Sequence, residues 1–133
     1  MTEHSVTVRE LAEFCFRRGD IDHRQMSSPT GAQGIEGHQR VFGRRPPSYQ
    51  NEYPVDYQYR YEGGVLSVRG RADGYDASEG LVEEIKTCRV NPKSIAPDVV
   101  AVHMAQARLY AALISQQNPC EALVVKLTWL KSA

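Results

Sequence analysis

Two short stretches decide the fold of this chain: RGRAD, Arg69–Asp73, and LVEEIK, Leu81–Lys86. Each is typical of a strand, and a short gap separates them. Because successive side chains of a strand point to opposite faces, Glu84 and Lys86 share one face of the second strand. With Asp73 ending the first strand, the sequence predicts two carboxylates and one ammonium group at a shared edge of a sheet.

These three groups suit a divalent cation beside a phosphodiester. Mg²⁺ prefers oxygen ligands, and it commonly binds one or two carboxylates together with substrate phosphate and water. A neighbouring lysine can orient the attacking water or help to deprotonate it. The same pattern is also typical of a salt-bridged surface strand, and a chain with 24% charged residues contains it often by chance.

A second feature is an alanine-rich segment, Asp98–Gln117, which we expect to form one helix that begins just after Pro97. His103, Gln106 and Tyr110 recur at helical spacing and form one polar stripe on a helix that we otherwise expect to be buried. Polar groups on a buried helix need partners. The stripe therefore either belongs to a functional site or bonds to strand ends and backbone.

Together these residues resemble the PD-(D/E)XK nuclease superfamily, in particular its RecB-like branch, in which an Asp, a Glu-x-Lys strand and a Gln-x-x-x-Tyr helix follow one another. Gln106–Tyr110 matches the helix motif, and Gly34–His38 matches an upstream Gly-x-x-x-His motif. The chain also looks like the nuclease module at the N-terminus of some bacterial DinG/XPD-type helicases. The segments that carry this narrower likeness are Val8–Phe14, Arg18–Asp22, Ser28–Thr30, Gly37–Gln39 and Arg44–Pro46.

The resemblance implies an α/β fold with a restriction-endonuclease-like core, in which helices flank a mixed sheet of about four strands. The order of elements that we expect along the chain, α-α-β-β-β-α-β, supports the same fold, and we expect a single domain over residues 1–133. The resemblance also implies a site. Its catalytic residues are Asp73, Glu84 and Lys86; its metal ligands are His38, Asp73, Glu84 and the backbone carbonyl of Ile85; Gln106, Tyr110 and His103 hold the strand or brace the site.

The remaining elements follow from periodicity and turn residues. The expected ranges are a helix over Thr7–Arg17, a turn over Ser27–Gly31, a second helix with Glu36 and His38, a hairpin of Glu52–Tyr61 and Val65–Ala72, and a last strand over Leu123–Leu130. Because Glu36 and His38 lie two positions apart on a helix, only one of them can point at a metal, and the resemblance favours His38.

Composition agrees with one small domain, since 133 residues with 41% hydrophobic content can bury a single core. We expect a cytoplasmic protein, because no apolar run is long enough for a membrane span or a secretory signal. The three cysteines, Cys15, Cys88 and Cys120, are too few for a disulfide framework, a zinc site or the four-cysteine iron-sulfur cluster of some RecB-like relatives. Cys88 is expected to be a small buried filler.

The formal net charge is zero, from sixteen basic and sixteen acidic residues, so the chain as a whole does not attract nucleic acid. Local clusters remain. Arg44 and Arg45 follow the His38 helix and Arg71 lies beside Asp73, and these side chains either contact phosphates or belong to a solvated surface. We expect weak, salt-sensitive binding to DNA. So small a surface favours a homodimer or a helicase domain or subunit as partner.

These features predict a deoxyribonuclease that depends on Mg²⁺ or Mn²⁺, an exonuclease or a single-strand or flap-type enzyme of DNA repair, recombination or defence that works alongside a helicase. One alternative is an endonuclease of restriction or repair type on the same core. The other is a nucleic-acid-binding or interaction module that keeps the fold without cutting. The intact set of Asp73, Glu84 and Lys86 favours an enzyme.

Overall fold

The structure is a computed structural model that describes residues 2–16, 31–120 and 122–132. These residues form five strands, three α-helices and one short 3₁₀ helix. In chain order they are β1 (Thr2–Thr7), α1 (Val8–Phe16), α2 (Gly31–Phe42), β2 (Gln50–Tyr61), β3 (Gly64–Asp76), β4 (Leu81–Cys88), η2 (Pro92–Ser94), α3 (Pro97–Gln117) and β5 (Val124–Lys131). The expected α/β class with a mixed sheet is confirmed. The sheet has five strands instead of four because β1 precedes the first helix.

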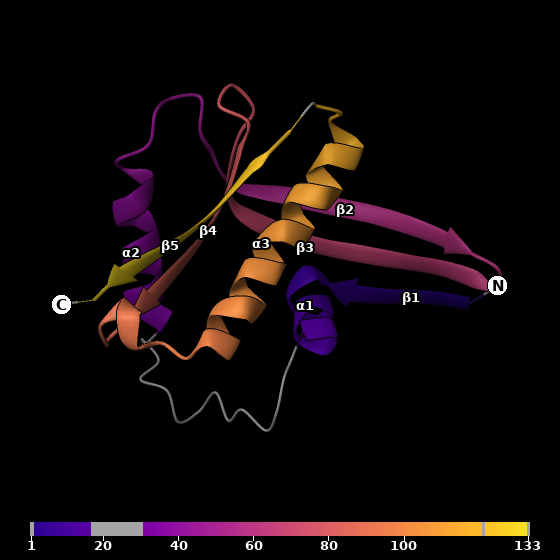
Figure 1. The fold of residues 1–133 in the computed structure, drawn as a ribbon. Coiled ribbons are helices and arrows are strands. Elements are labelled where there is room, and N and C mark those ends of the chain that lie inside the picture. The colour runs from indigo at the N-terminus through magenta and orange to yellow at the C-terminus, as the bar shows by residue number, and fades with distance from the viewer. Residues whose placement is uncertain (1, 17–30, 121, 133) are drawn as a thin grey trace.

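The long strand β3 organises the sheet, as Figure 1 shows. Along one edge it pairs antiparallel with β2. Along the other edge, β1 runs parallel to the first six residues of β3, and β4 runs antiparallel to Gly74–Asp76. The strand β5 then pairs in parallel with β4. Residues 70–73 of β3 therefore have neither β1 nor β4 beside them, which leaves a fork between these two strands.

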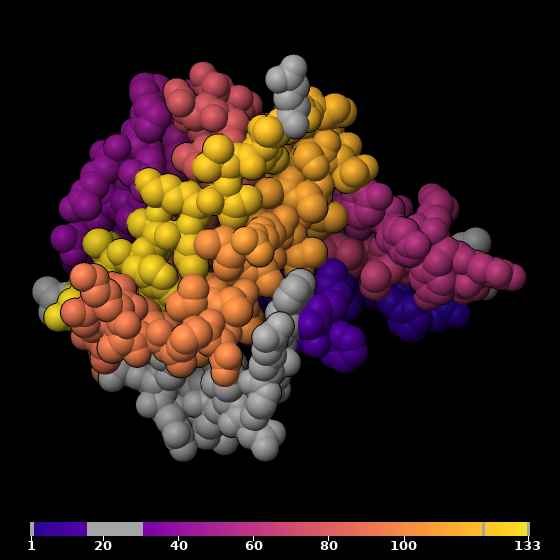
Figure 2. All heavy atoms as spheres, viewed as in Figure 1, coloured from indigo at the N-terminus to yellow at the C-terminus, as the bar shows by residue number. Residues whose placement is uncertain are grey.

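Helices cover both faces of the sheet near this fork. One core cluster contains Val8 of α1, Val82 of β4 and Tyr110 and Ile114 of α3, so α1 and α3 share a face. The helix α2 lies against β4 on the other face, where Gly37 meets Thr87. Beyond the helices, β1, β2 and the first half of β3 project as an arm, which Figure 2 shows as the extension on the right of the molecule.

The start of α1 is set by a capping box. The Thr7 hydroxyl accepts a hydrogen bond from the Glu10 backbone N–H at 3.0 Å, and the Glu10 carboxylate accepts one from the Thr7 backbone N–H at 3.1 Å. This reciprocal pair satisfies two backbone donors that the first helical turn leaves open. Val8 and Ala12 are fully buried, as their helical spacing predicts. The expected start at Thr7 was wrong by one residue because Thr7 is the cap.

The helix α3 begins at Pro97, close to the start that the sequence predicts, since proline fits the first turn of a helix. In the described part of the chain, no helix is both long enough and apolar enough to cross a membrane. The expected turn over Ser27–Thr30, and the segment Arg18–Asp22 that contributes to the family resemblance, lie outside the described residues.

Candidate functional site at the sheet fork

The strand β4 separates two neighbouring carboxylates. Glu84 and Lys86 lie on the face toward α3, as the alternation of the strand predicts, and Lys86 Nζ lies 3.2 Å from Glu84 Oε1. Glu83 points to the opposite face, toward α2, and is fully buried there. The two glutamates have adjacent positions and different partners, so they differ in what they can do.

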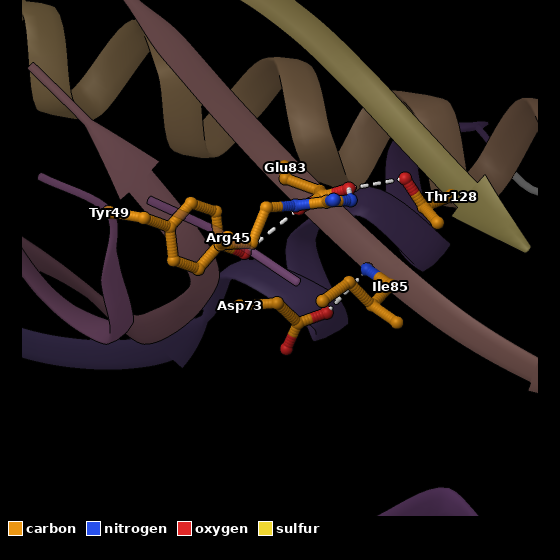
Figure 3. A network of polar contacts seen from close by, with 6 residues as sticks. All are labelled: Arg45, Tyr49, Asp73, Glu83, Ile85 and Thr128. Atoms are coloured by element: carbon orange, nitrogen blue, oxygen red, sulfur yellow. Dashed lines mark hydrogen bonds and ion pairs between the residues drawn. The ribbon is translucent and has the colours of Figure 1, made fainter. Parts of the chain in front are cut away.

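Asp73 lies in the fork where β3 and β4 part. Its Oδ2 accepts a hydrogen bond of 2.6 Å from the backbone N–H of Ile85, which is drawn in Figure 3. This bond satisfies a backbone donor of β4 that has no β3 partner at this level of the ladder. It also fixes the Asp73 carboxylate between the strand that carries it and the strand that carries Glu84.

A break in the ladder between β2 and β3 directs Asp73 into the fork. Glu52 and Asp73 would face each other in the register, yet neither is paired, and Glu52 adopts a positive φ of 51°. Tyr53 pairs with Ala72, but its ring centroid also lies 4.8 Å from that of Tyr75, three residues beyond Ala72. The alternation of β3 therefore slips by one residue around Asp73. No residue is added to either strand, so the pairing register is the same on both sides of this break, and the distortion changes the direction of the Asp73 side chain.

His38 reaches the same fork from α2. Its Nε2 lies 2.9 Å from the carbonyl oxygen of Ile85, and because a carbonyl only accepts, Nε2 carries the hydrogen. Its Nδ1 lies 3.8 Å from Asp73 Oδ1. In the neutral ring, Nδ1 then presents its lone pair toward the carboxylate. Glu36, the other candidate metal ligand on this helix, is exposed.

The approach of α2 to β4 depends on Gly37. A Cβ added at Gly37 would overlap the Oγ1 of Thr87, whereas one added at Gly34 would have nothing within 4 Å. Gly34 is the glycine of the sequence motif, but Gly37 is the one that lets the helix lie against the strand. Since Gly37 precedes His38, this close approach brings the imidazole to the Ile85 carbonyl.

The environment of Glu84 disfavours its charge. Burial, with a smaller contribution from the neighbouring Asp73 carboxylate, raises the pKa of Glu84 to about 8, although Lys86 acts in the opposite direction. Among the residues that the structure describes, Glu84 Oε2 is buried without a hydrogen-bond partner. A buried, unpaired carboxylate oxygen is costly, and a bound cation would remove that cost.

The donor set of the fork fits a hard divalent cation. No three His, Cys, Asp or Glu side chains in the described ranges form a ready-made cage for a metal ion. Mg²⁺ does not require one, because it commonly takes one or two carboxylates and completes its shell with waters and substrate oxygens. Asp73 and Glu84 offer the carboxylates, and the Ile85 carbonyl keeps a second lone pair beside its bond to His38.

Gln106 and Tyr110 are buried and brace the fork from α3. Burial raises the pKa of Tyr110 to about 12, while hydrogen bonds with Gln106 and with the Arg71 backbone act against that rise. Arg71 lies in the part of β3 that has neither β1 nor β4 beside it, so Tyr110 occupies the open edge. His103, one turn before Gln106 on α3, lies against Trp129 of β5, with ring centroids 5.7 Å apart.

The candidate arginines fall into two environments. Arg44 and Arg71 are exposed and can reach a ligand. Arg45 instead donates from Nε and Nη2 to the two carboxylate oxygens of Glu83, at 2.9 Å and 2.6 Å. The side chain of Arg45 is only 19% exposed. The sequence left a phosphate contact and a solvated surface position open for Arg45, and its geometry favours neither of them but a brace for Glu83.

Glu83 was not among the sequence-predicted site residues. Burial alone would raise its pKa, but hydrogen bonds from Arg45, Thr128 and Tyr49 outweigh burial and hold the pKa below its usual value. The pKa values of these two neighbouring glutamates are therefore shifted in opposite directions. The one signal in the sequence for Glu83 is its place between Leu81 and Ile85 on one face of the strand, which predicts an inward-facing carboxylate that needs partners. Cys88, expected to be a buried filler, is buried against Ile95 and Val99.

No family model and no curated protein matches this chain. Among solved structures, the chain is similar to the crystal structure of SSO0001, with a TM-score of 0.65 and 17% sequence identity. The match covers 98% of this chain and 64% of that chain, so this chain spans less than two thirds of the length of SSO0001. At so low an identity the likeness shows a shared fold alone.

Proposed function

We propose that this chain is a deoxyribonuclease that hydrolyses phosphodiester bonds with the help of Mg²⁺ or Mn²⁺. The observation that carries the proposal is the convergence of Asp73, Glu84, Lys86, His38 and the Ile85 carbonyl at one fork of the sheet. These groups come from two strands and a helix that are distant in sequence. A salt-bridged surface strand would not need Asp73 or His38 beside Glu84, nor a buried Glu84 oxygen without a partner.

Each group has a role in this proposal. Asp73 and Glu84 hold the metal ion, with the Ile85 carbonyl and His38 beside them. When bound, the ion stabilises negative charge on the phosphate and makes a bound water more acidic. Lys86 Nζ, which is 22% exposed at the side chain and lies next to Glu84, orients the attacking water. Gln106 and Tyr110 keep the open edge of β3 in place.

The proposal extends to the substrate and the setting. Zero net charge predicts weak binding that depends on salt. We infer that a partner, such as a helicase domain or a second copy of the chain, delivers the substrate as a single strand or a flap. The setting would be DNA repair, recombination or defence in the cytoplasm, and membership of the PD-(D/E)XK superfamily belongs to the same proposal.

Cleavage of end-labelled DNA tests this function. Single-stranded, duplex and flap substrates are incubated with Mg²⁺, with Mn²⁺ or with chelator, and the product ladder separates exonuclease from endonuclease cutting. Glu84→Gln keeps the shape of the side chain and should lose cleavage. Asp56→Asn is the matched control, since Asp56 is an exposed carboxylate on the projecting arm that pairs with Arg69 at 3.5 Å. If folded wild-type protein binds DNA and never cuts it, a non-cleaving binding module becomes the better description.

A further inference from the structure

Glu83 anchors a network on the face of β4 that lies opposite Glu84. Besides the two hydrogen bonds from Arg45, its Oε1 accepts one from the Tyr49 hydroxyl at 2.9 Å. Its Oε2 accepts another from the hydroxyl of Thr128 in β5. Figure 3 shows these side chains converging on Glu83 from separate parts of the fold. A fully buried carboxylate thus accepts four hydrogen bonds, two of them from the Arg45 cation that neutralises it.

The partners of Glu83 link the two parts of the chain that build the fork. Gly43 and Arg44 separate Arg45 from the end of α2, and the Arg45 backbone N–H donates to the Phe42 carbonyl at 3.1 Å, so a turn ties Arg45 to that helix. The same helix carries His38. Glu83 belongs to β4, which carries the Ile85 carbonyl and Glu84. The ion pair therefore fixes α2 relative to the strand that His38 must reach.

Tyr49 adds a second constraint at the base of Asp73. Its ring lies so close to Gly74 that a Cβ at this glycine would overlap the hydroxyl oxygen and two ring carbons. Gly74 follows Asp73 and pairs with Glu83 across the β3–β4 ladder. A single tyrosine therefore contacts β3 next to Asp73 and bonds to β4 next to Glu84, which holds the two strands together just below the fork.

We propose that Arg45 and Tyr49, acting through Glu83, are positioning residues that hold His38, Asp73 and Glu84 in their mutual arrangement. The part of this inference that concerns catalysis rests on the proposed nuclease function. The part that concerns geometry does not. Arg45 then has a positioning role instead of a DNA contact, because its Nε and Nη2 both donate to the Glu83 carboxylate.

Two conservative substitutions test the positioning role. Arg45→Lys keeps the positive charge but loses the bidentate geometry, and Tyr49→Phe keeps the ring over Gly74 but removes the hydroxyl. The control is Arg9→Ala, which breaks an exposed Arg–Glu pair of 3.1 Å on α1. Circular dichroism verifies that each variant is folded. The first readout is the NMR signal of the His38 ring, which needs no activity: we expect it to shift in both test variants and not in the control.

The second readout is cleavage. Residues that support a metal site typically change activity by roughly 10–100-fold when altered. We expect Arg45→Lys to lower kcat in this range at unchanged KM and unchanged salt dependence, and Tyr49→Phe to lower kcat less. A raised KM with a weaker salt dependence would show that Arg45 contacts phosphate and would overturn the inference. A His38 signal that stays in place in both folded variants would overturn it as well. Loss of the nuclease function itself would appear separately, as wild-type protein that does not cut while the His38 signal still responds.

Discussion

Replacing Gly37 by alanine tests how closely α2 must approach the sheet. A Cβ there would overlap Thr87 Oγ1 and lie 3.3 Å from Thr87 Cβ and Cγ2, so rotation of the threonine does not clear the space. Overpacking of this kind costs roughly 1–3 kcal/mol. Alanine is better than glycine in a helix by about 1 kcal/mol. The expected net loss of stability is therefore roughly 0–2 kcal/mol.

Gly34→Ala is the matched control, because Gly34 lies on the same helix and a Cβ there meets nothing within 4 Å. It should stabilise the protein by about 1 kcal/mol. The two variants should thus differ by roughly 1–3 kcal/mol, or about 4–12 °C in Tm at about 4 °C per kcal/mol for a domain of this size. Thermal unfolding followed by circular dichroism measures both.

A double variant identifies the cause. Removing Oγ1 and Cγ2 by Thr87→Ala in the Gly37→Ala background should recover most of the loss, since only the Cβ contact remains. Equal Tm values for Gly37→Ala and Gly34→Ala would contradict this prediction, because they would mean that α2 does not lie against β4 as closely as the structure indicates. The position of His38 beside the Ile85 carbonyl would then lose its support.

Three further predictions concern buried polar groups. Because the pKa of Glu84 rises from 4.5 to about 8 on folding, the folded state binds its proton more tightly, so metal-free stability in urea should fall as pH rises through this interval, and Glu84→Gln should flatten that fall. Glu83→Gln removes the charge that neutralises Arg45 and should cost about 3–5 kcal/mol in urea unfolding, whereas Glu13→Gln at the exposed α1 pair should cost under about 1 kcal/mol. Tyr110→Phe removes a buried hydroxyl and should cost about 1 kcal/mol; an unchanged urea midpoint would contradict its bracing role.

Local sequence rules predicted the parts of the site that depend on one element. The shared face of Glu84 and Lys86 follows from the period of a strand, and the polar stripe with Gln106 and Tyr110 follows from the period of a helix. The apolar face of α1 with Val8 and Ala12 was also predicted, but its cap at Thr7 was not. The convergence of His38 on the same fork came from the family resemblance, because no local rule links residues 38 and 85.

Other features depend on contacts between distant segments. The strand β1 is polar and mostly exposed, so it shows no alternation, and it forms because β3 offers it an unpaired edge. Arg45 belongs to a charged loop, a pattern that is typical of the surface. Its partner Glu83 lies 38 positions away, so no local pattern predicts their ion pair. The slip of β3 at Asp73 comes with a positive φ at Glu52 that nothing in the residue type predicts.

We propose that Asp73, Glu84 and Lys86 carry out metal-dependent cleavage of DNA. Single-turnover cleavage of an end-labelled single strand with Mg²⁺, by wild type, Asp73→Ala and Lys86→Ala of verified fold, tests it most directly. We expect that wild type cuts, that chelator stops the reaction and that both variants lose cleavage while keeping the fold. Cleavage that survives both substitutions, or folded wild type that cuts with neither Mg²⁺ nor Mn²⁺, would contradict it.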